Sequence, residues 1–203
     1  MEPEEIPDRI ETFKADLGRL GPERVVRKYS LSTQPYAISP DVYFELQVAV
    51  AERFEIHPSE VTIVGSGQLG FSIAPQKRFR HFGNNSDIDL AIVSPPLFER
   101  VWKLANEYWR ANRWWPEIGE FRKYLFRGWI RPDKMPPKNS FEFCAAWWEF
   151  FRSLTASGDY GPFKINAGLY SHWYFFEAYH VDNVTACAAE LVATDESGEE
   201  ENE

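Results

Sequence analysis

Two carboxylates separated by a single residue are the side chains in this sequence best suited to chemistry. Asp87 and Asp89 lie in the segment 87–93 (DIDLAIV), in which Ile88, Leu90 and Ile92 alternate with the acids. Residues two apart in a β-strand project from the same face, so both carboxylates would point the same way. Hard cations such as Mg²⁺ bind oxygen ligands, commonly one or two carboxylates together with substrate phosphates. The pair therefore predicts a catalytic Mg²⁺ or Mn²⁺ site for phosphoryl chemistry.

A second motif, Gly65-Ser66-Gly67, follows the short β-branched run 61–64. Such a run favours a buried strand, and the glycines that follow allow a tight turn. Without side chains, backbone N–H groups can approach a phosphate closely, and the hydroxyl of Ser66 can add a hydrogen bond. A strand that ends in this turn, together with a strand that carries two acids, makes a site for a nucleoside triphosphate and a metal ion physically coherent.

The two motifs resemble those of the nucleotidyltransferase superfamily related to DNA polymerase β, whose signature is a Gly-Ser turn and a later strand with two acids. The resemblance is carried by Val64-Gly65-Ser66 and Ser86-Asp87-Ile88-Asp89-Leu90, within residues 61–93. It implies that a nucleoside monophosphate is moved from an NTP to an acceptor, with release of pyrophosphate. Asp87 and Asp89 would bind the metal ions, and the triphosphate would contact Gly65, Ser66, Gly67 and Ser86.

Longer stretches, 65–72, 127–133 and 165–170, resemble a group of small stand-alone bacterial nucleotidyltransferase-like proteins. Some related proteins serve in phage defence or in toxin–antitoxin pairs, which would imply a protein partner. The motifs leave the acceptor open, because RNA or another nucleic-acid 3′ end, a protein hydroxyl, a small molecule or a second nucleotide would each suit them.

The sequence departs from the superfamily in the twenty residues between Ser66 and Asp87. This insertion contains a basic cluster, Lys77, Arg78, Arg80 and His81. One interpretation is a flexible flap over the phosphates, with Lys77 as a nucleotide ligand. The other is a surface loop whose charges only keep it soluble.

A more serious departure concerns the third acid, which the superfamily supplies from a later strand. The strand expected at 163–169 offers Asn166 at its centre. An amide can give one oxygen to a metal, but it brings no charge and cannot act as a base. Either another acid reaches the site, from Asp133, Glu142 or Asp159, or the protein is a catalytically inactive nucleotide- or partner-binding module.

The segment around Trp129 also allows two interpretations. Arg127 and Arg131 could bind phosphate while Trp129 stacks on a base, because guanidinium groups suit phosphate oxygens and aromatic faces suit bases. Alternatively, Trp129 anchors a loop that is tied by an ion pair between arginine and Asp133.

The elements that must position these residues predict an α+β fold, and the resemblance implies that this fold is a polymerase β-type palm. We expect a small mixed sheet built from strands 61–64, 87–93 and 163–169, with helices packed mainly on one face. The order Ser39-Pro40-Asp41 is typical of a helix N-terminus. Further helices are expected in four places along the chain, near 25–29, 95–108, 140–154 and 171–191.

Composition and charge indicate how the chain is divided into domain and tails, and which classes of function are disfavoured. The net charge is −9, and the segment 194–203 supplies six acidic and no basic residues. We expect it to be a disordered acidic tail, preceded by one domain over 9–193 and a flexible acidic leader over 1–8. An acidic chain argues against a general nucleic-acid-coating role. Two cysteines among apolar neighbours, and no signal peptide or membrane-length apolar run, predict a cytoplasmic protein.

Overall fold

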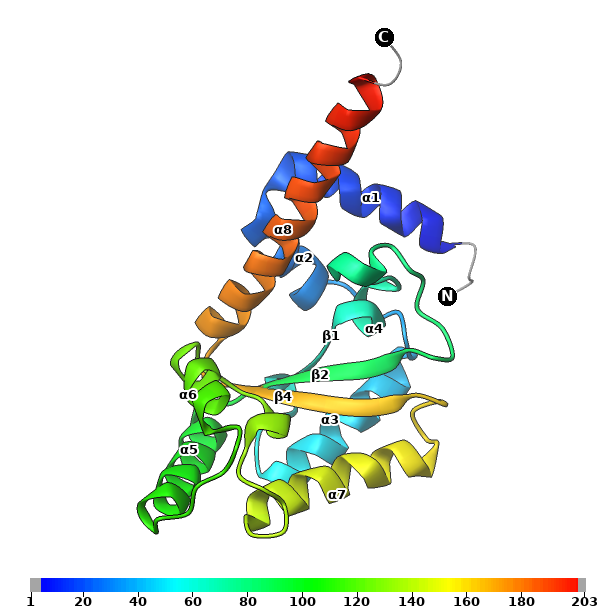
Figure 1. Ribbon diagram of the computed structural model, residues 1–203. Helices are drawn as coiled ribbons and strands as arrows, with labels where there is room; N and C mark the ends of the chain where they lie inside the picture. Colours follow the sequence, from blue (N-terminus) through cyan, green and yellow to red (C-terminus); the bar gives the residue numbers. More distant parts are fainter. Residues whose placement is uncertain (1–4, 201–203) are drawn as a thin grey trace.

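A mixed four-stranded sheet with strand order β1-β2-β4-β3 forms the centre of the protein in the computed structural model (Figure 1). The structure describes the backbone of residues 5–200 and the side chains of residues 5–193. β1 pairs antiparallel with β2, β2 pairs parallel with β4, and β3 pairs antiparallel with β4. The strands are β1 (Val61–Val64), β2 (Asp87–Val93), β3 (Trp129–Ile130) and β4 (Lys164–Tyr170). The predicted α+β class and mixed sheet are confirmed.

Helices precede, connect and follow these strands. The first three are α1 (Glu5–Leu20), α2 (Pro22–Leu31) and α3 (Pro40–Phe54). The later ones are α4 (Gly65–Leu69), α5 (Pro95–Arg110), α6 (Ile118–Phe126), α7 (Glu142–Ser157) and α8 (Trp173–Glu200). Short 3-10 turns occupy η1 (Pro58–Glu60), η2 (Pro75–Lys77) and η3 (Pro132–Lys134). None of the described helices is both long and apolar enough to cross a membrane.

The start of α3 shows how local sequence sets these boundaries. The Ser39 hydroxyl accepts a hydrogen bond from the N–H of Val42 at 3.4 Å, and Pro40 occupies the first turn, as the sequence predicted. A proline there loses nothing, since its missing N–H would have no partner inside the helix. The helix ends at Glu55, which adopts the left-handed conformation with φ of 58°.

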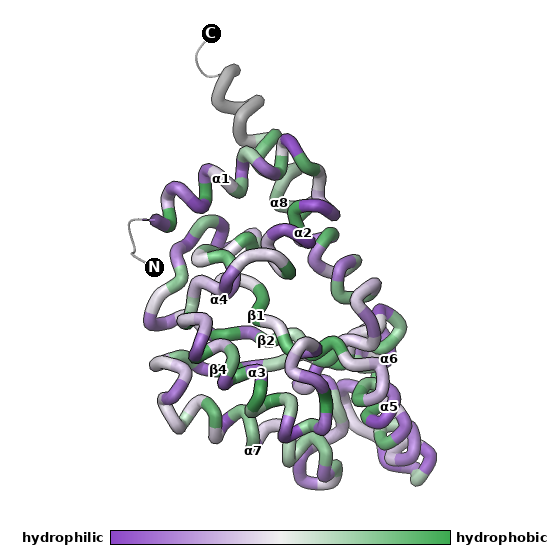
Figure 2. The backbone as a smooth tube through the Cα atoms, turned by 180° about the vertical axis from the view of Figure 1, so that it is seen from behind, coloured by the Kyte–Doolittle hydropathy of each residue, from purple (hydrophilic) through white to green (hydrophobic). Residues whose placement is uncertain are grey.

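The apolar face of β2 is buried under one layer of helices. Ile88, Leu90 and Ile92 are at most 2% exposed and belong to the largest core cluster. That cluster includes residues of α3, α5 and α7. Figure 1 shows α3 and α7 below the sheet, and Figure 2 shows α7 below it again from behind. Burial on this side fixes the pleat, so Asp87 and Asp89 must face the other way.

The opposite face of the sheet is partly covered as well, which corrects the expectation of helices mainly on one face. Ala91 and Val93 pack against Tyr170 and Phe176, the latter from the start of α8. In Figure 1, α1, α2, α4 and α8 lie on this side. The alternation of acids in β2 indicated a polar face, but only its first half is polar. The second half is apolar and needs a helix to cover it.

The two ends of the chain differ in detail from the expectations. α1 begins at Glu5, inside the leader predicted over 1–8, of which residues 1–4 lie outside the described part. The backbone of α8 continues to Glu200, while the side chains of 194–200 and all of 201–203 are not described. The predicted disorder of 194–203 therefore stays a prediction.

A second core holds the N-terminal helices to α8, with the buried carboxylate of Asp16 at its edge. Asp16 accepts hydrogen bonds from Lys28, from Arg19 at 2.8 Å and from the Tyr29 hydroxyl at 2.9 Å. These contacts, led by Lys28 and Arg19, lower the pKa of Asp16 to about 2. The network fixes α1 on α2 and orients Tyr29.

Replacing Asp16 with Asn should lower the free energy of unfolding near neutral pH by about 1–3 kcal/mol, because charged hydrogen bonds to a buried group are lost. A carboxyl whose pKa falls on folding stabilises the protein above its unfolded-state pKa, near 4, and loses that contribution as the pH falls toward 2. Urea unfolding across that range should show wild type and Asp16→Asn converging at low pH.

The matched control is Glu11→Gln, which alters an exposed acid on the same helix that forms an ion pair with Lys14. It should leave stability nearly unchanged. An equal loss of stability in Glu11→Gln and Asp16→Asn would contradict the role given to Asp16.

Candidate active site

A cavity of about 730 Å³ opens between the polar half of the sheet, the start of α4, and helices α2 and α8. The residues that line it come from segments far apart in the sequence. Among them are most of the predicted site residues, namely Gly65, Ser66, Lys77, Ser86, Asp87, Asp89 and Arg131. The fold therefore gathers the two motifs at one concave surface.

The parallel pairing of β2 with β4 sets the geometry of the acids. Asp87 stands opposite Lys164, and Asp89 stands opposite Asn166. The side-chain amide of Asn166 donates a hydrogen bond to Oδ2 of Asp87 at 3.3 Å. Asn166, at the centre of the strand expected from the sequence, thus lies beside the two acids. Two carboxylates and an amide oxygen within one cluster form a donor set that suits a hard divalent cation.

The electrostatics of Asp89 reflect this crowding. Its pKa is raised to about 6, first because the surrounding cavity wall removes solvent from the carboxylate and second because Asp87 is negatively charged. Asn166, Lys164 and Lys77 act in the opposite direction. Asp89 lines the cavity and its side chain is exposed to solvent there, so the surrounding protein replaces only part of its hydration. Two close carboxylates in such a place favour a bound cation.

The Gly-Ser motif lies directly beside the acids because β1 leads into it. Val64 pairs with Asp89, so Gly65 follows at the edge of the acid pair. Gly65 has φ of 64°, and a Cβ there would lie 4.0 Å from Oδ2 of Asp89. The first N–H groups of a helix have no acceptor within it, and those of α4 begin at this point. Gly65 and Ser66 are therefore placed to approach a phosphate held near the acids.

Gly67 has a different role from the one predicted. It is buried, and a Cβ there would lie 3.2 Å from Cγ2 of Ile63. Its carbonyl accepts hydrogen bonds from the N–H groups of Tyr36 and Ala37 at 3.0 and 2.9 Å. Gly67 therefore allows α4 to pack closely on β1 and is not among the residues that line the cavity.

The basic insertion is folded against the body of the protein. The N–H of Ser72 bonds to the carbonyl of Arg80 at 2.9 Å, and Arg78 forms an ion pair with Glu190 of α8. Lys77, Arg80 and His81 line the cavity. Arg78, which fastens the segment to α8, fits neither earlier interpretation, whereas Lys77, Arg80 and His81 face the cavity. The nucleotide contact of Lys77 stays a prediction.

The Trp129 segment matches the structural interpretation, a loop anchored by tryptophan. Arg131 donates two hydrogen bonds to the carboxylate of Asp133, both at 3.0 Å. The Trp129 ring stacks on Tyr170, with centroids 5.5 Å apart and planes 3° apart. Trp129 and Arg131 still reach the cavity wall, whereas Arg127 is exposed at the end of α6 and does not line it. The predicted nucleotide contact of Arg127 has no support from this placement.

A third carboxylate does not join the pair within the described part of the chain. No cluster of three or more His, Cys, Asp or Glu side chains that could hold a metal occurs there. Asp133 lines the cavity but is bound to Arg131 and Lys134. Glu142 lines a different pocket, beside Arg53, and Asp159 is exposed after α7. Beside Asp87 and Asp89, the place of a third carboxylate is therefore taken by the amide of Asn166.

The cavity also brings together three residues that were not among the predicted site residues, Tyr29 from α2 and His180 and Asn183 from α8. Burial lowers the pKa of His180 to about 4, so its ring is neutral at physiological pH. Its Nε2 atom is buried and has no hydrogen-bond partner within the described residues. Only the polarity of His180 and Asn183 in a largely apolar helix hinted at a cavity-facing position.

Replacing Asp89 with Asn should stabilise the protein at about pH 8 without divalent cations, and have little effect at about pH 4. The pKa of Asp89 is raised to about 6 on folding. The folded state therefore binds more protons than the unfolded state between about pH 4 and pH 6, and the free energy of unfolding falls as the pH rises through that range. Thermal unfolding at the two pH values measures the difference.

Asp159→Asn, an exposed acid outside the cavity, should show no such difference between the two pH values. A lower Tm for Asp89→Asn than for wild type at the higher pH would contradict the desolvated, repelled state of Asp89.

Comparison of the chain with protein-family models, with curated proteins and with solved structures found no match. Membership of the nucleotidyltransferase superfamily therefore stays a prediction from the two motifs. The functional interpretation rests on the chemistry of the cavity itself.

Proposed function

We propose that the protein is a metal-dependent nucleotidyltransferase that moves a nucleoside monophosphate from an NTP to an acceptor. The observation that carries this proposal is the position of Asp87 and Asp89, which share one face of β2 beside Gly65 and Ser66 in a cavity. The raised pKa of Asp89 supports it, because close, desolvated carboxylates are typical of sites that bind a cation or take part in chemistry.

In this proposal one group of residues binds the metal ion and another binds the phosphates of the NTP. Asp87 and Asp89 hold Mg²⁺ or Mn²⁺, which neutralises phosphate charge when bound. The N–H groups at the start of α4 and the Ser66 hydroxyl bind phosphate oxygens, with Ser86 nearby. Lys77 and Arg80, which line the same cavity, add positive charge. The chemical work of these residues is positioning and electrostatic stabilisation.

The proposed reaction balances without further reactants. An oxygen of the acceptor forms a bond to the α-phosphorus as the bond between that phosphorus and the bridging oxygen breaks. Pyrophosphate leaves, and the acceptor's proton passes to solvent.

A second candidate function is metal-dependent nucleotide binding without transfer. Asn166 favours it, because it puts an amide where a third carboxylate would add charge and basicity. The two candidates share the cation and the triphosphate and differ only in whether a bond to the α-phosphorus breaks.

Incubation with each α-labelled NTP, Mg²⁺ or Mn²⁺, total RNA and cell lysate tests the proposal directly. We expect labelled product with the wild type and at least a hundredfold less with Asp87→Ala/Asp89→Ala, on the order of the loss when charge stabilisation is removed. Asp159→Ala is the control for loss of an acid outside the cavity. Tight metal-dependent NTP binding with no transfer to any acceptor would favour the second candidate and overturn the first.

Asn166→Asp supplies the carboxylate that the site lacks. We expect Mn²⁺ affinity to rise by roughly tenfold or more, because a third charged oxygen ligand joins the pair. Titration calorimetry at about pH 8 measures this. Weaker Mn²⁺ binding in Asn166→Asp than in wild type would show that the cation does not sit between Asp87, Asp89 and position 166.

A further inference from the structure

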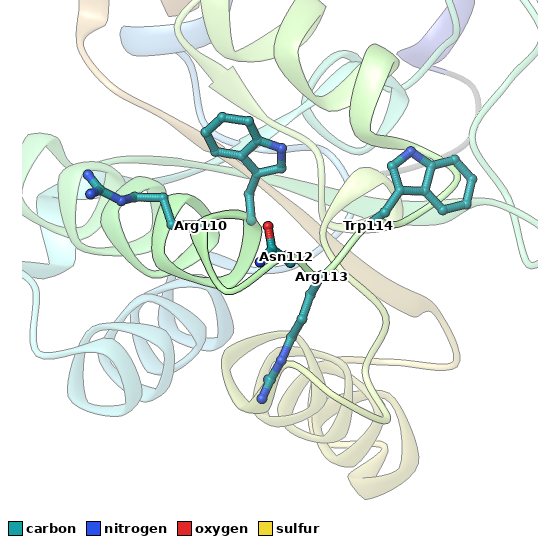
Figure 3. Close-up of a pocket in the computed structure, with 5 residues that line it drawn as sticks. Arg110, Asn112, Arg113 and Trp114 are labelled. Atoms are coloured by element: carbon teal, nitrogen blue, oxygen red, sulfur yellow. The ribbon is translucent and has the colours of Figure 1, made fainter.

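A second pocket, of about 390 Å³, lies at the C-terminal end of α5, which is the end that points away from the sheet (Figure 1). Because α5 has 16 residues and begins two residues after β2, this end lies roughly 24 Å along the helix from the sheet. Figure 3 shows Arg110 and Arg113 extending in different directions from the turn at Asn112, with Trp114 projecting beyond it. We call the residues that line it the Trp–Arg surface: Trp109, Arg110, Asn112, Arg113 and Trp114.

The tryptophans of this surface are unusually accessible. Trp114 is 70% exposed and Trp109 is 47% exposed, and Trp102 of the same helix is 49% exposed. By contrast Trp115, immediately after Trp114, is 2% exposed and belongs to the largest core cluster. Large apolar side chains grouped on a surface mark a place where another molecule binds.

Charge at this surface is opposite to that of the whole chain. Residues 103–131 contain seven Lys or Arg and three Glu, whereas the net charge of the protein is −9. Arg122 lies over the Trp109 ring at 5.2 Å, and Arg113 lies over the Tyr108 ring at 5.3 Å. No ion pair with a described carboxylate engages Arg110, Arg113 or Arg122. Their charges are therefore available to an anionic partner.

We propose that the Trp–Arg surface binds a single strand of nucleic acid. Exposed tryptophan rings offer stacking platforms for unpaired bases, and neighbouring guanidinium groups suit the phosphates between them. The Asn112 side chain, at the centre of the turn, offers a donor and an acceptor for a base edge.

An anionic membrane would also attract exposed tryptophan and arginine side chains, so vesicles serve as the alternative ligand in the test below. Binding at this surface does not depend on chemistry at Asp87 and Asp89. Where both hold, a strand bound at this surface is a candidate acceptor for the proposed transfer.

The test is fluorescence anisotropy of labelled 12-nucleotide single strands, RNA and DNA, over a series of salt concentrations. Trp114→Ala should weaken binding roughly tenfold without changing the slope of log affinity against log salt, since it removes stacking only. Arg110→Gln/Arg113→Gln should reduce that slope by about 1.4, the value for two phosphate contacts on a single strand.

Two exposed residues on other helices provide controls, Phe44→Ala on α3 and Arg152→Gln on α7. Both should bind as the wild type does. The proposal is overturned if neither strand binds, if the Trp114 and arginine variants bind like the controls, or if only vesicles containing phosphatidylserine bind in a way that these variants abolish. Because the full-length protein is used without NTP, failure here is distinct from failure of nucleotidyl transfer.

Discussion

The parallel pairing of β2 with β4 is the constraint on which the candidate site depends. It sets Asp89 opposite Asn166 and Asp87 opposite Lys164, while β1 on the other side of β2 delivers Gly65 beside Asp89. Alternation along β2 means that a shift of one residue would bury both acids and expose the apolar residues between them. Packing of those apolar residues against α3, α5 and α7 therefore holds the acids in place as firmly as it holds the core.

The same constraint brings like charges together at an energetic cost. Desolvation and the charge of Asp87 both disfavour ionisation of Asp89, and only Asn166, Lys164 and Lys77 oppose them. A protein selected for stability alone would replace one of the two acids. Both acids nevertheless line one cavity together with basic side chains. This arrangement is expected if a cation and a polyanion bind in that cavity together. The network around Asp16 shows the contrasting case, in which a buried carboxylate is fully paired and its pKa is lowered.

Where a short segment carries its own signal, the sequence predicted structure well. The cap at Ser39, the strand that ends at Gly65 and the two-faced strand of Asp87 and Asp89 were all predicted and confirmed. The two-residue strand β3 was not predicted, since it exists only because β4 pairs with it.

Side-chain roles were harder to predict when they depended on distant partners. The sequence alone could not show that Gly67 packs on Ile63 or that Arg78 forms an ion pair with Glu190. Nor could it show that His180, about ninety residues after Asp89 in the chain, lines the same cavity. Each of these follows from tertiary contacts between segments whose local patterns are unremarkable.

The most direct test of the account is crystallographic. Crystals grown with Mn²⁺ and a non-hydrolysable NTP analogue should show an anomalous peak bridging Asp87 and Asp89, with the triphosphate running along the start of α4 toward Lys77. A nucleotide bound elsewhere, or Mn²⁺ absent from the acid pair while the nucleotide is present, would contradict the claim that these two carboxylates form a metal and nucleotide site.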